Sequence, residues 1–140
     1  MTSRNPSKEE VDELVKRYRP PGWTLKYKAK GKDIWTQCYA KKEIKEILCP
    51  NPYHGRNELF VFIHECGHYW LRHWDRGLNH YHVEEYEAER WAIETLRRHG
   101  IAVPRRGLHE AKKYVRWCIS QDEKKGIEIK SHVRRWAKGK

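Results

Sequence analysis

The segment from residue 58 to residue 74 constrains this chain most, because it is strongly apolar within a sequence of 140 residues that is 35% charged. Ile63, Gly67, Trp70 and Trp74 recur in it at positions i, i+4, i+7 and i+11. This spacing places all four residues on one face of an α-helix. We therefore predict a long helix whose apolar stripe faces the core.

The chain before this segment predicts one helix and a small sheet. Residues 8–19 carry apolar side chains at i, i+3, i+4 and i+7, and two prolines follow them. Alternating, β-branched and aromatic residues then predict two or three short antiparallel strands. The strand-like runs are 23–27, 34–40 and 44–48. Residues 49–57 contain two prolines and a glycine, so we expect a loop there.

The chain after residue 82 predicts three more helices. Residues 83–99 carry one apolar face and are followed by Gly100, a common helix stop. Gly126 separates the next helix from a short last one. The apolar stripes are Ala88, Trp91, Ala92, Thr95 and Leu96; Leu108, Ala111, Val115, Cys118 and Ile119; and Ile129, Val133 and Trp136. The basic side chains expected opposite the second stripe are Lys112, Lys113 and Arg116.

These elements predict an α+β fold. A small antiparallel sheet would pack on the helix of residues 58–74, and the further helices would follow at the C-terminal end. The length fits a single domain over residues 1–140.

His64, Glu65 and His68 lie in the apolar helix in the pattern His-Glu-x-x-His. Histidines four residues apart project from one helix face, about 40° apart around its axis, so both rings can reach one Zn²⁺. Glu65 lies beside that face, where a carboxylate can take a proton from a metal-bound water without ligating the metal. Gly67 has no side chain, so another element can approach closely. The pattern is typical of zinc proteases.

A catalytic zinc needs a third protein ligand, and the spacing leaves several candidates. His73 follows His68 by five residues, about 140° further round the helix, so we expect it to point away. Glu84 and Glu85 fall within the apolar arc of the next helix, where a carboxylate needs a partner. Glu87 lies about 100° from the centre of that arc. Acidic residues also favour the first turn of a helix because of the helix dipole, so their position alone does not show whether they are metal ligands. The remaining candidates are His80 and His82.

Two runs together resemble a known family. The sequence FVFIHECGH at residues 60–68 is followed by EYEAERWA at residues 85–92. They are similar to the HExxH and E-x-[EQ]-A-[ND]-x-F-A patterns of ImmA/IrrE-type metallopeptidases, which are small intracellular gluzincins. The resemblance covers residues 34–97, and it implies that this part is a catalytic core with a short sheet over the active-site helix.

Carried over residue by residue, the resemblance implies that His64, His68 and Glu85 bind Zn²⁺ and that Glu65 is catalytic. Glu89 stands at the family's Asn or Asp position, where a contact to a ligand histidine is expected. The implied activity is hydrolysis of a peptide bond in a protein or peptide substrate, by a zinc-bound water with Glu65 as general base. The candidate oxyanion stabilisers are Tyr81, His82 and Tyr86, and Glu87 is the fallback third ligand.

A second resemblance is to SprT-like proteases, which also carry HExxH and act on proteins bound to DNA. Their third ligand is a histidine, which His80 or His82 would supply. The C-terminal zinc ribbon usual in that family is missing, because the four cysteines form no C-x-x-C pair. We expect these cysteines to be reduced thiols. The glutamate-based site is therefore favoured.

The formal net charge of +11 is concentrated at the C-terminal end. Residues 97–140 hold 14 Lys and Arg against 4 Asp and Glu, whereas residues 1–96 hold 16 against 15. We consider two interpretations, a solvated basic surface and a nucleic-acid contact through basic residues 105–140. The second makes a basic nucleic-acid-binding module without proteolysis an alternative function, and it also suits a protease acting on a DNA-associated protein. Trp117 is the aromatic residue most expected at the surface, while Tyr114 and Trp136 lie nearby.

No stretch approaches the roughly 18 consecutive apolar residues of a membrane span, and the first residues contain no apolar targeting segment. We therefore expect a cytoplasmic protein without a membrane contact.

Overall fold

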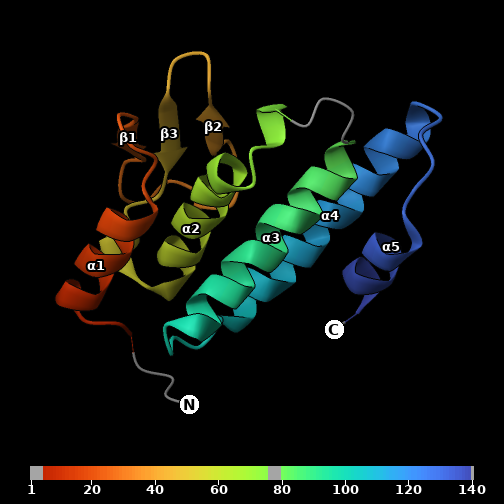
Figure 1. Ribbon diagram of the computed structural model, residues 1–140. Coiled ribbons are helices and arrows are strands. Elements are labelled where there is room, and N and C mark those ends of the chain that lie inside the picture. Colours follow the sequence, from red (N-terminus) through yellow and green to blue (C-terminus); the bar gives the residue numbers. More distant parts are fainter. Residues whose placement is uncertain (1–4, 76–79, 140) are drawn as a thin grey trace.

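The structure, a computed structural model, describes residues 5–75 and 80–139. The sheet and α2 form one part of the molecule, and the long helices α3 and α4 run side by side next to it, with α5 against them (Figure 1). The elements in chain order are α1 Lys8–Tyr18, β1 Thr24–Tyr27, β2 Tyr39–Lys41, β3 Glu46–Cys49, the 3₁₀ turn η1 Pro52–His54, α2 Arg56–Trp70, the 3₁₀ turn η2 His73–Asp75, α3 Tyr81–Arg98, α4 Arg105–Lys124 and α5 Ser131–Lys138. The predicted α+β class is confirmed. Within the described residues, no helix is long and apolar enough to cross a membrane.

The predicted first helix is confirmed as α1. Its start is capped reciprocally: Ser7 Oγ accepts a hydrogen bond from Glu10 N–H at 3.1 Å, and the Glu10 carboxylate accepts one from Ser7 N–H at 2.8 Å. Its apolar face is buried against the core at the predicted residues, Val11, Leu14, Val15 and Tyr18.

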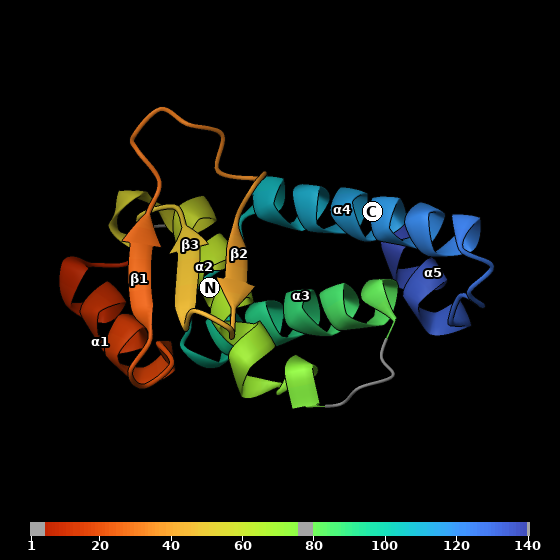
Figure 2. The same ribbon diagram turned by 90° about the horizontal axis from the view of Figure 1, so that it is seen from above.

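The sheet is mixed, which corrects the antiparallel sheet expected from the sequence. Figure 2 shows β3 between β1 and β2; it pairs with β2 antiparallel and with β1 parallel. A tight turn with Lys45 at φ 50° joins β2 to β3, whereas the long segment 28–38 separates β1 from β2. The long segment carries the chain to the far side of β3, and a parallel pair requires such a crossover. Only Tyr39 and Ala40 of the expected strand 34–40 enter β2.

Helix α2 packs on one face of the sheet and contributes much of the core (Figure 2). It ends at Trp70 rather than at residue 74, because the chain turns at Arg72, whose φ is 57°. Trp70 was expected in the core but is 42% exposed, and its indole N–H donates to the carbonyl oxygen of Tyr18 at 2.7 Å. Trp74 reaches the core from η2, where it packs against Trp23.

Helices α3, α4 and α5 follow the predicted order. Gly100, at φ 72°, follows the end of α3 as expected. The stripe of α4 packs on α5 in a second buried cluster formed by Val115, Ile119, Val133 and Ala137. Lys112 was expected to face solvent but is buried, because α5 folds back over this part of α4. Its Nζ lies 5.2 Å from the ring centroid of Trp136, a cation–π contact that offsets part of the cost of burial.

A buried pair of hydrogen-bonded residues, His82 and Asp122, ties the start of α3 to the end of α4. The backbone N–H and the ring Nδ1 of His82 lie 2.9 and 2.7 Å from Oδ2 of Asp122. The N–H of Lys130, just before α5, donates to His82 Nε2 at 3.2 Å. Burial alone would raise the pKa of Asp122, but these hydrogen bonds from His82 outweigh burial and lower it.

Replacing Asp122 tests this tie. Asp122→Ala should reduce the free energy of unfolding by about 2–4 kcal/mol, because it leaves buried donors of His82 without an acceptor. Asp122→Asn keeps an acceptor and should cost less. Urea denaturation measures both, beside Glu123→Ala, an exposed neighbour whose loss should cost less than about 1 kcal/mol. A loss in Asp122→Ala no larger than in Glu123→Ala would contradict the role of the pair.

The same tie should depend on pH in a defined direction. Because folding lowers the pKa of Asp122, its charge stabilises the fold fully above the ordinary pKa of 3.8. The contribution is lost as the pH falls through the lowered pKa. The difference in unfolding free energy between the wild type and Asp122→Asn should therefore shrink on acidification.

Candidate metal centre

Helix α2 presents His64, Glu65 and His68 to an open cavity of about 430 Å³ that is lined by the sheet edge, α2, α3 and α4. The two imidazole rings lie 4.9 Å apart, at 88° to each other. The side chains of His64 and Glu65 are each only 8% exposed. The three residues each offer one ligand atom within 4.8 Å of the others, so this group could hold a metal ion.

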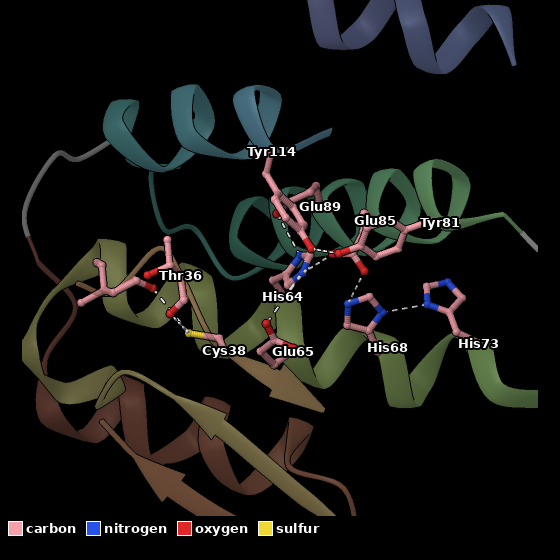
Figure 3. Close-up of polar contacts among 11 residues, drawn as sticks. Thr36, Cys38, His64, Glu65, His68, His73, Tyr81, Glu85, Glu89 and Tyr114 are labelled. Atoms are coloured by element: carbon pink, nitrogen blue, oxygen red, sulfur yellow. Dashed lines mark hydrogen bonds and ion pairs between the residues drawn. The ribbon is translucent and has the colours of Figure 1, made fainter. Parts of the chain in front are cut away.

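Glu85, in the second turn of α3, meets both histidines (Figure 3). Its Oε1 lies 3.2 Å from Nε2 of His64, and its Oε2 lies 3.1 Å from Nε2 of His68. Ligand atoms about 2.0–2.1 Å from one tetrahedral ion lie roughly 3.3 Å from each other, so the contact of Glu85 with each histidine has the spacing of a pair of zinc ligands. Glu65 is further away, with its Oε2 3.9 Å from Nε2 of His64.

The close approach expected at Gly67 is confirmed. A Cβ atom on Gly67 would lie 2.9 Å from Cε3 of Trp91, closer than real side chains pack. The missing side chain thus lets α3 lie against α2 near the histidines. It helps bring Glu85 within reach of them.

Glu89, one turn after Glu85, contacts the other ring nitrogen of His64. Its Oε1 lies 2.9 Å from Nδ1 of His64, where the family resemblance implied such a contact. The contact leaves Nε2 of His64 directed at Glu85. A buried carboxylate on each side of one imidazole is costly unless each ring nitrogen carries a hydrogen or binds a metal ion on the side that faces the carboxylate.

The buried charges shift one another's pKa values. Burial alone would raise the pKa of Glu85, but the imidazoles of His68 and His64 lower it far below its ordinary value. Burial opposes protonation of His64, yet the carboxylates around it raise its pKa. Burial raises the pKa of Glu65, and the two imidazoles offset only part of that rise. Glu85 is therefore the carboxylate held most firmly as an anion.

His73 lies against His68, which corrects the expectation that it points away. The prediction assumed that the helix continues past residue 70, but the turn at Arg72 carries His73 back toward the site. Nδ1 of His73 lies 2.9 Å from Nδ1 of His68. On the other side of the ring, Nε2 of His73 lies 3.0 Å from Oε1 of Glu87.

Within the described part of the chain, the other candidate third ligands do not contact the two histidines as Glu85 does. Glu87, the fallback ligand, contacts His73. Both ring nitrogens of His82 are engaged, by Asp122 and by the backbone of Lys130. His80 is exposed and is not among the described residues that line the cavity, whereas Glu84 lines it.

Two tyrosines cover the cavity on the side of α3 and α4. The hydroxyl groups of Tyr81 and Tyr114 hydrogen-bond to each other, and both side chains lie beside Glu85 in Figure 3. Tyr86, another oxyanion candidate, packs instead on Trp136. From the sequence, Tyr114 is a candidate only for base stacking, because the packing of α4 over this cavity is a contact between elements that are distant in the chain. A usable signal was the small residues Gly107 and Ala111 before it, which share its helix face and also line the cavity.

Cys38 also lines the cavity, but its thiol is not activated. Burial and the negative charge of Glu65 raise the pKa of Cys38 to about 11, so the thiol keeps its proton at neutral pH. All four cysteines are free, as expected.

Comparison with known proteins gives no match, whether the chain is set against protein-family models, curated proteins or solved structures.

The contact at Gly67 can be tested by adding one methyl group. Gly67→Ala should reduce the free energy of unfolding by about 1–3 kcal/mol, because the methyl group must displace Trp91. In a helix without such a contact, alanine is about 1 kcal/mol more favourable than glycine. A net loss of stability therefore means that the clash with Trp91 outweighs this gain. Urea denaturation of the metal-free protein measures it. Adding Trp91→Phe should recover part of the loss, and simple additivity of the two changes would contradict the contact.

Proposed function

We propose that this protein is a zinc-dependent metallopeptidase in which His64, His68 and Glu85 hold Zn²⁺ and Glu65 is the general base. One observation carries the proposal: the two oxygens of Glu85 meet the Nε2 atoms of both histidines at 3.2 and 3.1 Å. Two imidazoles and one carboxylate are also the donor set of many catalytic zinc sites. The site adjoins a cavity, which leaves room for a substrate.

The positions of the residues around the site support peptide hydrolysis as the proposed reaction. When bound, zinc would polarise a peptide carbonyl and lower the pKa of a water molecule beside it. Glu65 would accept a proton from the attacking water and return it to the nitrogen of the leaving amine. The hydroxyl groups of Tyr81 and Tyr114 bond to each other, so the one that accepts this bond keeps its hydrogen free. That hydroxyl would donate a hydrogen bond to the carbonyl oxygen as negative charge develops on it.

The ImmA/IrrE-type family remains the affiliation that we propose, and the positions of Glu85 and Glu89 beside His64 support it. The SprT-like alternative needs a third histidine. It has less support, because both nitrogens of His82 are engaged and the exposed His80 does not line the cavity. We further propose a cytoplasmic enzyme whose substrate is a protein associated with DNA, since residues 97–140 are strongly basic.

Metal binding by the wild type and by Glu85→Ala tests the proposal. The wild type should bind about one zinc per chain, and Glu85→Ala should bind it at least about 100-fold more weakly, because losing a ligand costs more than losing a ligand's partner. Elemental analysis and competition with a chelator measure both. Glu94→Ala is the matched control, since Glu94 is an exposed carboxylate on the same helix.

Loss of Glu65 should separate metal binding from catalysis. Glu65→Gln should still bind zinc but lose about 10²- to 10⁴-fold in peptide hydrolysis, the usual contribution of a general base. A wild type that takes up no zinc, or a Glu85→Ala variant that binds it as tightly as the wild type, would refute the proposed site.

A second function, nucleic-acid binding, is supported by the outer face of α4. Arg106, Lys113, Trp117 and Lys124 are exposed, and their spacing of seven, four and seven residues places them on one stripe along the helix. Trp117 is 51% exposed. An aromatic ring within a row of cations suits single-stranded nucleic acid, whose bases stack and whose phosphates bind cations.

Fluorescence anisotropy with a labelled single-stranded oligonucleotide, measured over a range of salt concentrations, tests this second function. Lys113→Glu with Lys124→Glu should weaken binding and make the logarithmic salt dependence of the affinity shallower by about 0.7 for each phosphate that is no longer neutralised. Trp117→Ala should weaken binding at every salt concentration. The control, Lys8→Glu with Lys16→Glu on α1, makes the same charge change elsewhere. Equal effects of the two double variants would mean that the oligonucleotide is attracted only by the net positive charge of the protein and not by the stripe on α4.

A further inference from the structure

We propose that His73 is a positioning residue for the metal centre, which holds His68 in the tautomer that directs Nε2 at the metal. The proposal deepens the zinc site proposed above and rests on it for its effect on metal binding. It adds two residues, His73 and Glu87, to which neither the motif nor the family resemblance assigns this role.

The geometry is a chain of contacts that leads away from the metal centre. Glu85 contacts Nε2 of His68 at 3.1 Å, and Nδ1 of His68 faces Nδ1 of His73 at 2.9 Å. Nε2 of His73 in turn lies 3.0 Å from Oε1 of Glu87. The side chain of His73 is only 3% exposed, whereas that of Glu87 is 27% exposed. This chain of contacts therefore leads from the buried site to a partly exposed carboxylate.

The proton positions follow from the end of this chain. A carboxylate accepts hydrogen bonds, so Nε2 of His73 must carry the hydrogen that faces Glu87. In a neutral ring, Nδ1 of His73 is then the acceptor. The hydrogen between the two rings must therefore belong to Nδ1 of His68. With Nδ1 of His68 donating to His73, Nε2 of His68 is the nitrogen left to face Glu85. It donates a hydrogen to this carboxylate in the metal-free protein, and loss of that hydrogen would leave a lone pair on Nε2 for the proposed metal.

The two proposed histidine ligands are thus held in different ways. Nδ1 of His64 faces the carboxylate of Glu89 directly at 2.9 Å. Nδ1 of His68 instead reaches a carboxylate, that of Glu87, through the ring of His73. Removal of His73 should therefore loosen His68 and leave the contacts of His64 with Glu85 and Glu89 in place.

The position of His73 depends on local backbone geometry. The turn at Arg72, with φ 57°, lets the chain reverse directly after α2. Glu87 comes from α3, two residues after Glu85, so α3 supplies both ends of the contact chain. The contact chain therefore also reports whether α3 is correctly seated on α2.

Zinc affinity of matched variants tests the proposal. His73→Phe keeps a ring but removes the acceptor, and it should weaken zinc binding by about 10- to 100-fold, the usual cost of losing a ligand's hydrogen-bond partner. His73→Asn keeps an acceptor near the position of Nδ1 and should restore much of the affinity. Glu94→Ala is the surface control. Unfolding of the metal-free variants in urea corrects for any general loss of stability.

The tautomer of His73 in the metal-free wild type gives an independent readout. Nitrogen-15 NMR of the imidazole rings should show hydrogen on Nε2 and none on Nδ1 of His73. Hydrogen on Nδ1, or zinc affinity in His73→Phe equal to that of the wild type, would overturn the proposal. Failure of the proposed function looks different, because the wild type would then bind no zinc while the NMR measurement still decides the role of His73.

Discussion

The packing of α3 on α2 is the contact on which the rest of the site depends, because it buries carboxylates beside imidazoles. An unpaired buried carboxylate is costly, so Glu85 and Glu89 are compatible with the core only while they face His64 and His68. A slip of one residue along α3 would turn these carboxylates away by about 100°. The close contact at Gly67 therefore helps to set both the stability of the helix pair and the geometry of the proposed ligands.

Helix α4 connects this buried site to the outer surface. Tyr114 faces the cavity and Trp117 faces outward, although their rings stack 5.9 Å apart at 14°. Negative and positive side chains are also separated between the cavity and the outer face of α4. Five glutamates line the cavity, namely Glu65, Glu84, Glu85, Glu89 and Glu110, and none of the described residues that line it is Lys or Arg. The proposed metal site and the proposed nucleic-acid stripe thus use separate faces of the molecule with opposite charge.

Much of the fold could be predicted from periodicity, because each helix buries one face. Most stripe residues of α1, α3 and α4 are buried where the spacing placed them, whereas Trp91 and Leu108 are only partly buried. Strand order could not be predicted, since the parallel pairing of β1 with β3 depends on the path of the connection over residues 28–38. The burial of Lys112 also escaped prediction. Local spacing puts it on the polar side of α4, and only α5 folding over that side encloses it.

The four-residue spacing of His64 and His68 is enough to place both on one helix face with Glu65 beside it, because residues four apart lie on the same side of an α-helix. The sequence also limited the third partner to a few acidic residues and histidines on the next helix. Only the tertiary structure separated Glu85 from Glu87 and brought His73 and Tyr114 to the site. These choices depend on where α2 ends and on how α3 and α4 pack over it. Contacts between elements set both, and no local spacing encodes them.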